Sequence, residues 1–271
     1  MAYGEGSHVE GTGTISGGNF AHAEGQGSMA LGVGSHAEGG AGIATGEYAH
    51  AEGKESTATG KSAHSEGSNS NASGEAAHAE GNGTEASGNY AHAEGDGAIA
   101  FGPSSHAEGG RYGGAINRAN GEASHVEGAG CTAEGIYSHA GGQAASTPSG
   151  FAATFAHGVG VIAPSTEGAA AFGRWNAEHT SGSDSPIPIF VIGNGKIEGN
   201  AAQRRDIFRA YEHGCNVLGV LTVETGNLNV KQGNLIVEQG SLKIDKITIG
   251  EKTYTLSVDD AGNLKATEIT S

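Results

Sequence analysis

Small and polar residues alternate along the first half of the chain in a block that returns at a fixed interval. The block reads Ser/Ala-His-Ala-Glu-Gly, and its histidine recurs every 14 residues from His8 to His106. After a slip of five residues the repeat resumes at His125 and His139. A fixed period of this size predicts a solenoid, in which each repeat is one coil stacked on the last.

Alternation inside each block assigns the side chains to the two faces of a short strand. In Ala49-His50-Ala51-Glu52-Gly53 the alanines and the glycine share one face, and the histidine and glutamate share the other. Only Ala, Ser and Gly fit inside a flattened coil. The His and Glu columns are therefore predicted to form an outer ladder that rises about 4.8 Å per coil, with glycine wherever the backbone turns or packs closely.

The outer ladder is constant along the chain, whereas the outward positions of the opposite strand vary. An interior of Ala and Ser buries little apolar area, and at about 25 cal/mol per Å² such a core is weak. Association along the ladder would compensate for this, so an obligate oligomer is expected. The alternative is a solvated ladder of polar side chains, because exposed ion pairs stabilise a protein only slightly.

These coils resemble the head of the YadA-like trimeric autotransporter adhesins, a left-handed parallel β-roll with an S-V-A-I-G motif in each coil. Here SHAEG stands in that place, and the segments Gly173–Asn176 and Phe190–Gly195 are similar to the part that closes such rolls. The HAEG form looks more like phage tail-fibre and appendage proteins. Because the two apolar side chains of the family motif face the trimer interior, the resemblance implies an axial trimer interface made of His8, Glu10, His22, Glu24, His36, Glu38, His50, Glu52, His64, Glu66, His78, Glu80, His92, Glu94, His106, Glu108, His125, Glu127 and His139.

The later part of the chain changes character twice. After Gly142 the repeat degrades, and an aromatic cluster from Phe151 to Trp175 predicts a cap on the solenoid. Further on, glycines every seven residues from Gly219 to Gly240 lead Leu-x-Val or Leu-x-Ile pairs, which indicate short strands. One chain cannot enclose such a rod, so three chains are expected to wind into a β-prism or triple β-helix.

The predicted fold class is thus all-β. Four segments are expected: a roll of HAEG repeats at 1–142; degenerate coils, a cap and a linker at 143–200; a β-prism-like segment with seven-residue GNLxV repeats at 201–250; and a C-terminal hairpin at 251–271. Within these, a strand, a turn at His213-Gly214 and another strand are predicted for 207–218.

Composition and charge narrow the classes of partner. The net charge of −16 disfavours nucleic acid and anionic membranes, which need clustered Lys and Arg. No apolar run approaches the roughly 20 residues that span a bilayer, and residues 1–4 already belong to the first repeat rather than to a signal peptide. Cys131 and Cys215 are too far apart in sequence to indicate a disulfide framework. Assembly in a host cytoplasm, without membrane insertion, is therefore expected.

Thirteen histidines raise the question of metal binding. Rings of His on a threefold axis would suit Zn²⁺ or Ni²⁺, but an HxE pair repeated along ten coils is better explained as a structural ladder. The chain also lacks a phosphate-binding GxxxxGK(S/T) loop and any nucleophile–base constellation. We therefore predict no metal, no cofactor and no enzymatic activity.

The predicted function is that of a homotrimeric virion fibre or appendage of a phage or tailocin, bound to other virion proteins and to a host-surface glycan or protein. The alternatives are a capsid decoration or baseplate spacer without a receptor, and a bacterial trimeric surface adhesin. Contact is expected at varied outward residues and at an insertion after Gly109, which a tolerated surface loop would also explain. The candidate contact residues are Met29, Leu31, Ile99, Phe101, Arg111 and Tyr112.

Overall fold

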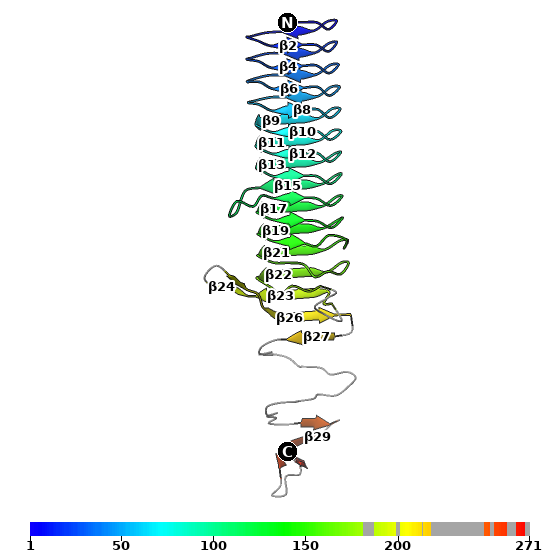
Figure 1. Cartoon of the computed structure of the whole chain (residues 1–271). Coiled ribbons are helices and arrows are strands. Elements are labelled where there is room, and N and C mark those ends of the chain that lie inside the picture. The colour runs from blue at the N-terminus through cyan, green and yellow to red at the C-terminus, as the bar shows by residue number, and fades with distance from the viewer. Residues whose placement is uncertain are drawn as a thin grey trace. The chain divides into compact units, whose positions relative to one another are not determined.

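The computed structural model describes residues 1–180, 187–198, 201–212, 214–217, 247–249, 252–258 and 264–268. The chain divides into two compact units, Met1–Val220 and Leu221–Ser271. The first unit is a parallel β-solenoid whose coils each give one strand to either side of a flat roll (Figure 1). The predicted solenoid of 14-residue coils is therefore confirmed, while its left-handed winding stays a prediction.

The larger sheet of the roll has 15 strands and contains the SHAEG blocks. Equivalent residues of successive coils pair in parallel register, so that His50 lies beside His64 and His78 beside His92. Its parallel strands are β1 (His8–Val9), β3 (His22–Ala23), β5 (His36–Ala37), β7 (His50–Ala51), β9 (His64–Ser68), β11 (His78–Asn82), β13 (His92–Asp96), β15 (His106–Gly109), β17 (His125–Ala129), β19 (His139–Gln143), β21 (Phe155–Val159), β22 (Ala170–Arg174) and β23 (Phe190–Asn194).

The smaller sheet has 10 strands and forms the opposite side of the roll. It keeps the same register, with Ala30 paired to Ala44 and Ala44 to Ala58. Its strands are β2 (Ile15–Ser16), β4 (Met29–Ala30), β6 (Ile43–Ala44), β8 (Thr57–Ala58), β10 (Asn71–Ala72), β12 (Glu85–Ala86), β14 (Ile99–Ala100), β16 (Arg118–Ala119), β18 (Thr132–Ala133) and β20 (Ser146–Thr147).

The interior of the roll is built from alanine, as the alternation predicts. Ala49 and Ala51 are 1% and 0% exposed, whereas His50 and Glu52 between and after them are half-exposed. Some of the serines that replace alanine donate to a turn carbonyl, as Ser35 Oγ does to Gly32 O at 2.8 Å, whereas the hydroxyls of Ser65 and Ser105 have no hydrogen-bond partner in the described part of the chain. The prediction of small residues inside and of His and Glu outside is confirmed.

Two glycine columns allow the coils to stack at strand spacing. A Cβ at Gly46, four residues before His50, would fall on the carbonyl oxygen of Gly60 in the next coil. Gly53, three residues after His50, has a φ of +92°, and a Cβ there would clash with the carbonyl oxygen of Gly67. Backbone therefore packs directly on backbone at both edges of the roll, and any side chain there would separate the coils.

At the end of the roll the predicted degenerate coils are present, but the aromatic residues do not close them as the predicted cap. Phe155 and Phe172 were expected in a cap, but β21, β22 and β23 continue the parallel ladder, with Phe155 beside His139 and Phe190 beside Ala170. These aromatic residues fill the outward positions of the sheet instead of closing its end. Antiparallel pairing follows at β26 (Asp206–Tyr211) and β27 (Gly214–Val217), next to a hairpin of β24 (Lys196–Glu198) and β25 (Ala201–Gln203).

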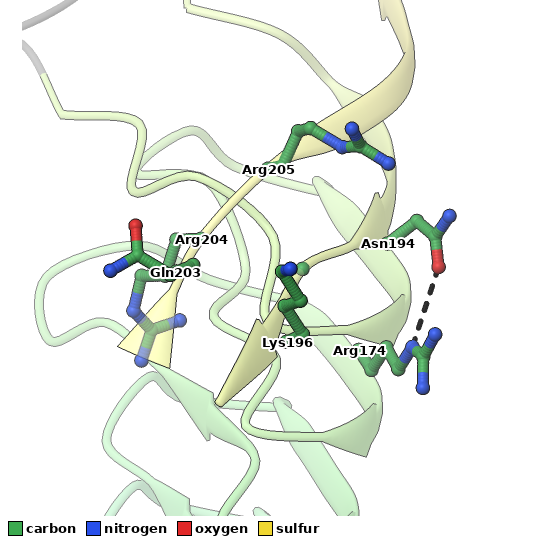
Figure 2. A pocket seen from close by; sticks show the side chains of 7 residues that line it. Arg174, Asn194, Lys196, Gln203, Arg204 and Arg205 are labelled. Carbon is green, nitrogen blue, oxygen red and sulfur yellow. Dashed lines mark hydrogen bonds between the residues drawn. The ribbon is translucent and has the colours of Figure 1, made fainter. Parts of the chain in front are cut away.

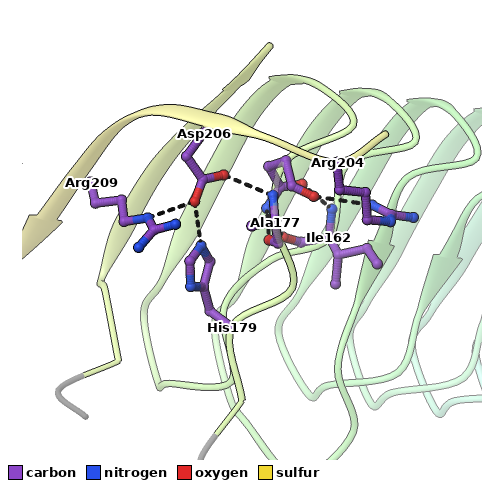
Figure 3. Close-up of polar contacts among 7 residues, drawn as sticks. Ile162, Ala177, His179, Arg204, Asp206 and Arg209 are labelled. Atoms are coloured by element: carbon purple, nitrogen blue, oxygen red, sulfur yellow. Dashed lines mark hydrogen bonds and ion pairs between the residues drawn. The ribbon is translucent and has the colours of Figure 1, made fainter. Parts of the chain in front are cut away.

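A buried polar cluster, here called the Asp206 latch, fastens β26 to the last coils (Figure 3). Asp206 Oδ2 accepts hydrogen bonds from His179 Nε2 and Arg209 Nε, each at 2.7 Å, and Oδ1 accepts one from the Ala177 amide at 2.8 Å. The Asp206 and His179 side chains are 0% and 1% exposed. Burial alone would raise the pKa of Asp206, but the hydrogen bond from His179 and the two further ones outweigh it and lower that pKa.

The second unit contains β28 (Ile247–Ile249), β29 (Lys252–Val258) and β30 (Leu264–Glu268). Strands β29 and β30 pair antiparallel, as the predicted hairpin requires, and β28 pairs antiparallel with β29. The seven-residue repeats from Gly219 to Gly240 lie outside the described residues, so the β-prism stays a prediction. In the described part of the chain, no helix is long and apolar enough to cross a membrane.

Candidate functional site

The outward side of the larger sheet, here called the ladder face, is the most regular surface of the first unit. From His22 to His125 the imidazole rings stack nearly parallel, with centroids 4.7–5.0 Å apart. The glutamates two residues on form a second column beside them, because in-register pairing places Glu80 next to Glu94. The structure thus brings the predicted interface residues from His8 to His139 onto one face; whether that face is a trimer interface stays a prediction.

The polar atoms of the ladder are only partly satisfied within one chain. His50 Nε2 lies 3.8 Å from a Glu52 oxygen and 3.9 Å from a Glu38 oxygen, which is too long for a hydrogen bond. Among the described residues of a single chain, Nε2 is buried without a hydrogen-bond partner in His22, His36, His50, His64, His78, His92, His106, His125 and His139. Such buried unpaired atoms are uncommon and call for a partner.

Burial and the stacking of like groups together shift the pKa values of the ladder residues. Burial, together with neighbouring imidazoles, lowers the pKa of His50, His64 and His92. A hydrogen bond with Glu66, together with burial, raises the pKa of Glu52 to about 7. The same shared proton lowers the pKa of Glu66. Adjacent carboxyl groups therefore share protons, since two carboxylates this close cannot both ionise freely.

The ladder face changes from polar to aromatic towards its C-terminal end. Phe155 stacks on His139 with centroids 4.7 Å apart, and Phe172, Phe190 and Phe208 follow at 5.1, 5.7 and 6.0 Å. Phe172 is 37% exposed and the other three are half-buried. A continuous aromatic strip is thus left open on the same face as the His and Glu columns.

Several histidine and glutamate groups of the ladder meet the distance requirement for a metal ion. The ligand atoms of His50, Glu52 and His64 lie within 4.8 Å of one another, and so do those of Glu127, His139 and His157. The regular repeat of the His and Glu pairs predicts a structural ladder without metal. The geometry does not test that prediction, but it identifies where an ion would bind.

The predicted contact residues fall on two surfaces away from the ladder face. Leu31 and Phe101 are exposed beside the smaller sheet, and Met29 and Ile99 are half-buried on it. The other two residues lie in the insertion, which bulges from the roll between β15 and β17 (Figure 1). Arg111 donates from Nε to Asp96 at 3.0 Å, and the Tyr112 backbone pairs with Ala115. The insertion is therefore anchored to the roll, and its role in contact stays a prediction.

Exposed aromatic residues at one turn of the coil were missed by the sequence analysis. Tyr48 and Tyr90 are 58% and 61% exposed, and each has a positive φ that side chains rarely adopt. They occupy the position two residues before the histidine, as Phe20 and Tyr137 also do. Alignment of the coils could have revealed these residues, because aromatic side chains recur at the turn position two residues before the histidine.

A basic cavity of about 540 Å³ lies at the C-terminal end of the roll, lined by Arg174, Asn194, Gly195, Lys196, Gln203, Arg204 and Arg205 (Figure 2). It holds four of the 14 Lys and Arg residues of a strongly acidic chain. Arg204 is fixed by the Gly160 carbonyl at 2.8 Å, by Glu178 at 3.4 Å and by the Trp175 ring at 5.3 Å. Among the described residues, no carboxylate pairs with Arg174 or Arg205.

Comparison with known proteins agrees with this geometry. The chain matches the YadA head domain repeat over residues 23–49, 79–105 and 93–111, and no curated protein matches it. Head domains of this family are typically trimeric and non-enzymatic. Residues 23–49 and 79–111 are thus similar to the YadA head domain repeat, and the 14-residue coils of this chain form a parallel β-solenoid.

Proposed function

We propose that the chain is a homotrimeric fibre or appendage of a phage or tailocin virion, with the ladder face of each chain turned towards two sister chains. The observation that carries the trimer is the ladder face itself. It combines buried Nε2 atoms that lack partners with an open aromatic strip, and it repeats one His and Glu pattern over the coils from His8 to Glu127. A second and a third copy of the same face supply an equally repetitive partner.

The energetics favour this arrangement over a solvated ladder. The interior consists mainly of alanine, so each coil buries little apolar area of its own. Covering Phe155, Phe172 and Phe190 would add the apolar burial that the interior lacks. The polar part of the ladder would then set the register between chains, because His and Glu side chains of two chains can pair only when their coils lie at the same height along the trimer axis.

The assignment to a virion is supported by the resemblance of the HAEG repeats to phage tail-fibre and appendage proteins. Host contact is supported by surfaces outside the ladder face, namely the varied residues of the smaller sheet and the basic cavity. Guanidinium groups bind phosphate and carboxylate well, so the cavity suits an anionic host-surface glycan. Three copies in one trimer would strengthen weak individual contacts by avidity.

Light scattering on the purified chain tests the trimer. The mass should be about three times 26.9 kDa. Phe172→Glu places a charge in the aromatic strip and should yield monomers, whereas the control Phe101→Glu alters a similarly exposed Phe (42% against 37%) on the other sheet and should leave the trimer intact. A folded wild-type monomer, or equal masses for the two variants, would show that the ladder face is not the interface.

Labelling native particles with antibodies against the chain tests the virion assignment. Purified trimer should also bind host cells and compete with particle adsorption, and Arg174→Gln and Arg205→Gln should each compete less well than the charge-matched control Lys61→Gln. Labelled particles without competition would favour a decoration or spacer protein. Labelling of the bacterial surface alone would favour an adhesin.

A further inference from the structure

Two departures from the repeat meet at one point of the ladder. The glutamate column runs through Glu127, but the next coil has Gly141 in that position and the coil after it has His157. The loss of a side chain at Gly141 leaves a space directly in front of its backbone. The side chains on either side of that space are those of a carboxylate and an imidazole.

Three potential ligand atoms surround this space. His139 Nε2 lies 3.5 Å and His157 Nδ1 lies 3.6 Å from the same oxygen, Glu127 Oε1. A Cβ built at Gly141 would be 2.6 Å from His157 Nδ1, 2.9 Å from Glu127 Oε1 and 3.0 Å from His139 Nε2. One point in front of Gly141 is therefore almost equidistant from two imidazole nitrogens and one carboxylate oxygen.

We propose that Glu127, His139 and His157 form a binding site for a divalent transition-metal ion of the zinc class, in the space that Gly141 leaves open. Two imidazoles and one carboxylate are a common ligand set for Zn²⁺, with distances of about 2.0–2.2 Å. Each ligand atom is within about 1 Å of such a distance from the central point. Small side-chain movements would complete the coordination, and a fourth position stays open for water or another group.

The surroundings suit a bound ion. His139 Nε2 is buried and has no hydrogen-bond partner among the described residues, so it is available as a ligand atom. Phe155 stacks against the His139 ring and restricts its orientation. The regular coils differ in one respect, because there a glutamate occupies the position that is vacant at Gly141. The site is formed by one chain, so it does not depend on the proposed trimer or virion role.

Equilibrium titration of the full chain with ZnCl₂ tests the site. Wild type should bind one tight equivalent per chain, in addition to any weaker binding along the regular ladder. Gly141→Ala fills the space with a methyl group and should weaken the tight equivalent by at least about tenfold. The control Gly40→Ala, at a glycine where an added Cβ would meet no atom within 4 Å, should bind like wild type.

A second variant guards against misfolding of the first. His157→Phe removes one ligand while keeping a ring in a column that continues with Phe172, so the fold should persist. It should also lose the tight equivalent, and Zn²⁺ should raise the melting temperature of wild type but not of either site variant. The proposal is overturned if wild type binds no tight equivalent, or if Gly141→Ala and His157→Phe retain it unchanged.

Discussion

At the scale of single residues, the stacking of the coils depends on which positions are glycine. Sequence reasoning could place Ala inside and His and Glu outside because strand alternation has only two faces. It could also mark the glycines as necessary. The alignment of the coils separates Gly46, whose column is always glycine, from Gly40, whose place is taken by Lys54 in the next coil. It could not show that a Cβ at Gly46 would strike the carbonyl of the next coil whereas one at Gly40 would face open space.

A pair of alanine substitutions tests this difference. Gly46→Ala should destabilise the chain by about 3 kcal/mol or more, because the added methyl would strike the Gly60 carbonyl and neither backbone can move without breaking the ladder. Gly40→Ala should change the free energy of unfolding by no more than about 0.5 kcal/mol. Urea denaturation of both variants provides the comparison. Equal stabilities would contradict direct backbone packing between coils.

At the scale of elements, the end of the roll shows where sequence reasoning failed. Phe155 and Phe172 were assigned to a cap because the 14-residue motif is no longer recognisable after Gly142 and the end of a solenoid must be capped. The structure keeps the strand register while changing the outward residues, so the aromatic residues extend the ladder face. Pairing depends on backbone spacing, whereas the repeat was recognised by side chains. When only the side chains change, the strands can therefore continue after the repeat can no longer be recognised in the sequence.

The Asp206 latch predicts a stability effect confined to one element. Removing Asp206 takes away the buried carboxylate that binds both His179 and Arg209, and the loss of one member of a buried pair costs about 3–5 kcal/mol. Asp206→Ala should therefore reduce the hydrogen-exchange protection of β26 by at least about 100-fold. The exposed Asp96→Ala, which removes the Arg111 contact, should cost less than about 1 kcal/mol.

The same latch fixes the sign of an acid effect. The folded pKa of Asp206 is lowered, so its contribution is complete above the unfolded value of about 3.9 and disappears as the pH falls through the folded value. Protection of β26 in wild type should fall in that acid range, and Asp206→Ala should show no comparable loss. A wild-type profile that stays flat down to pH 2 would argue against the latch.

At the scale of the whole molecule, the ladder makes stability depend on pH through two opposing sets of groups. The histidines with lowered pKa withdraw stability as the pH falls below the unfolded value of about 6.5. Glu52, with its pKa raised to about 7, contributes stability fully only below the unfolded value of about 4.3 and loses it as the pH rises through 7. The net profile is therefore flatter than either contribution.

Glu52→Gln separates the two contributions. The amide is neutral at every pH, so the variant should melt about 2–4 °C above wild type at pH 8. Its melting temperature should also fall more steeply than that of wild type between pH 7 and pH 5. The control Glu122→Gln changes an exposed turn carboxylate and should follow wild type. Parallel profiles for wild type and Glu52→Gln would contradict proton sharing between the carboxyl groups.

Sequence reasoning reached the solenoid and the ladder because both follow from local periodicity. It missed the basic cavity and the Asp206 latch because these join residues far apart in sequence, such as Arg174 with Arg205 and Asp206 with His179. The sequence indicates part of the proposed metal site, because Gly141 and His157 interrupt the repeat next to Glu127 and His139. That the three ligand atoms lie close together follows only from the register of β17, β19 and β21.

Pairing of identical residues between successive coils has a consequence for how such a chain can change length. Removing residues 50–63 would join His36 and its coil directly to the coil of His64, and each strand would meet a partner of the same type. Removing one residue fewer would turn every later side chain to the wrong face. The solenoid can therefore change length only by whole coils. Recombination between repeats can add or remove coils, and each new neighbour still pairs in register.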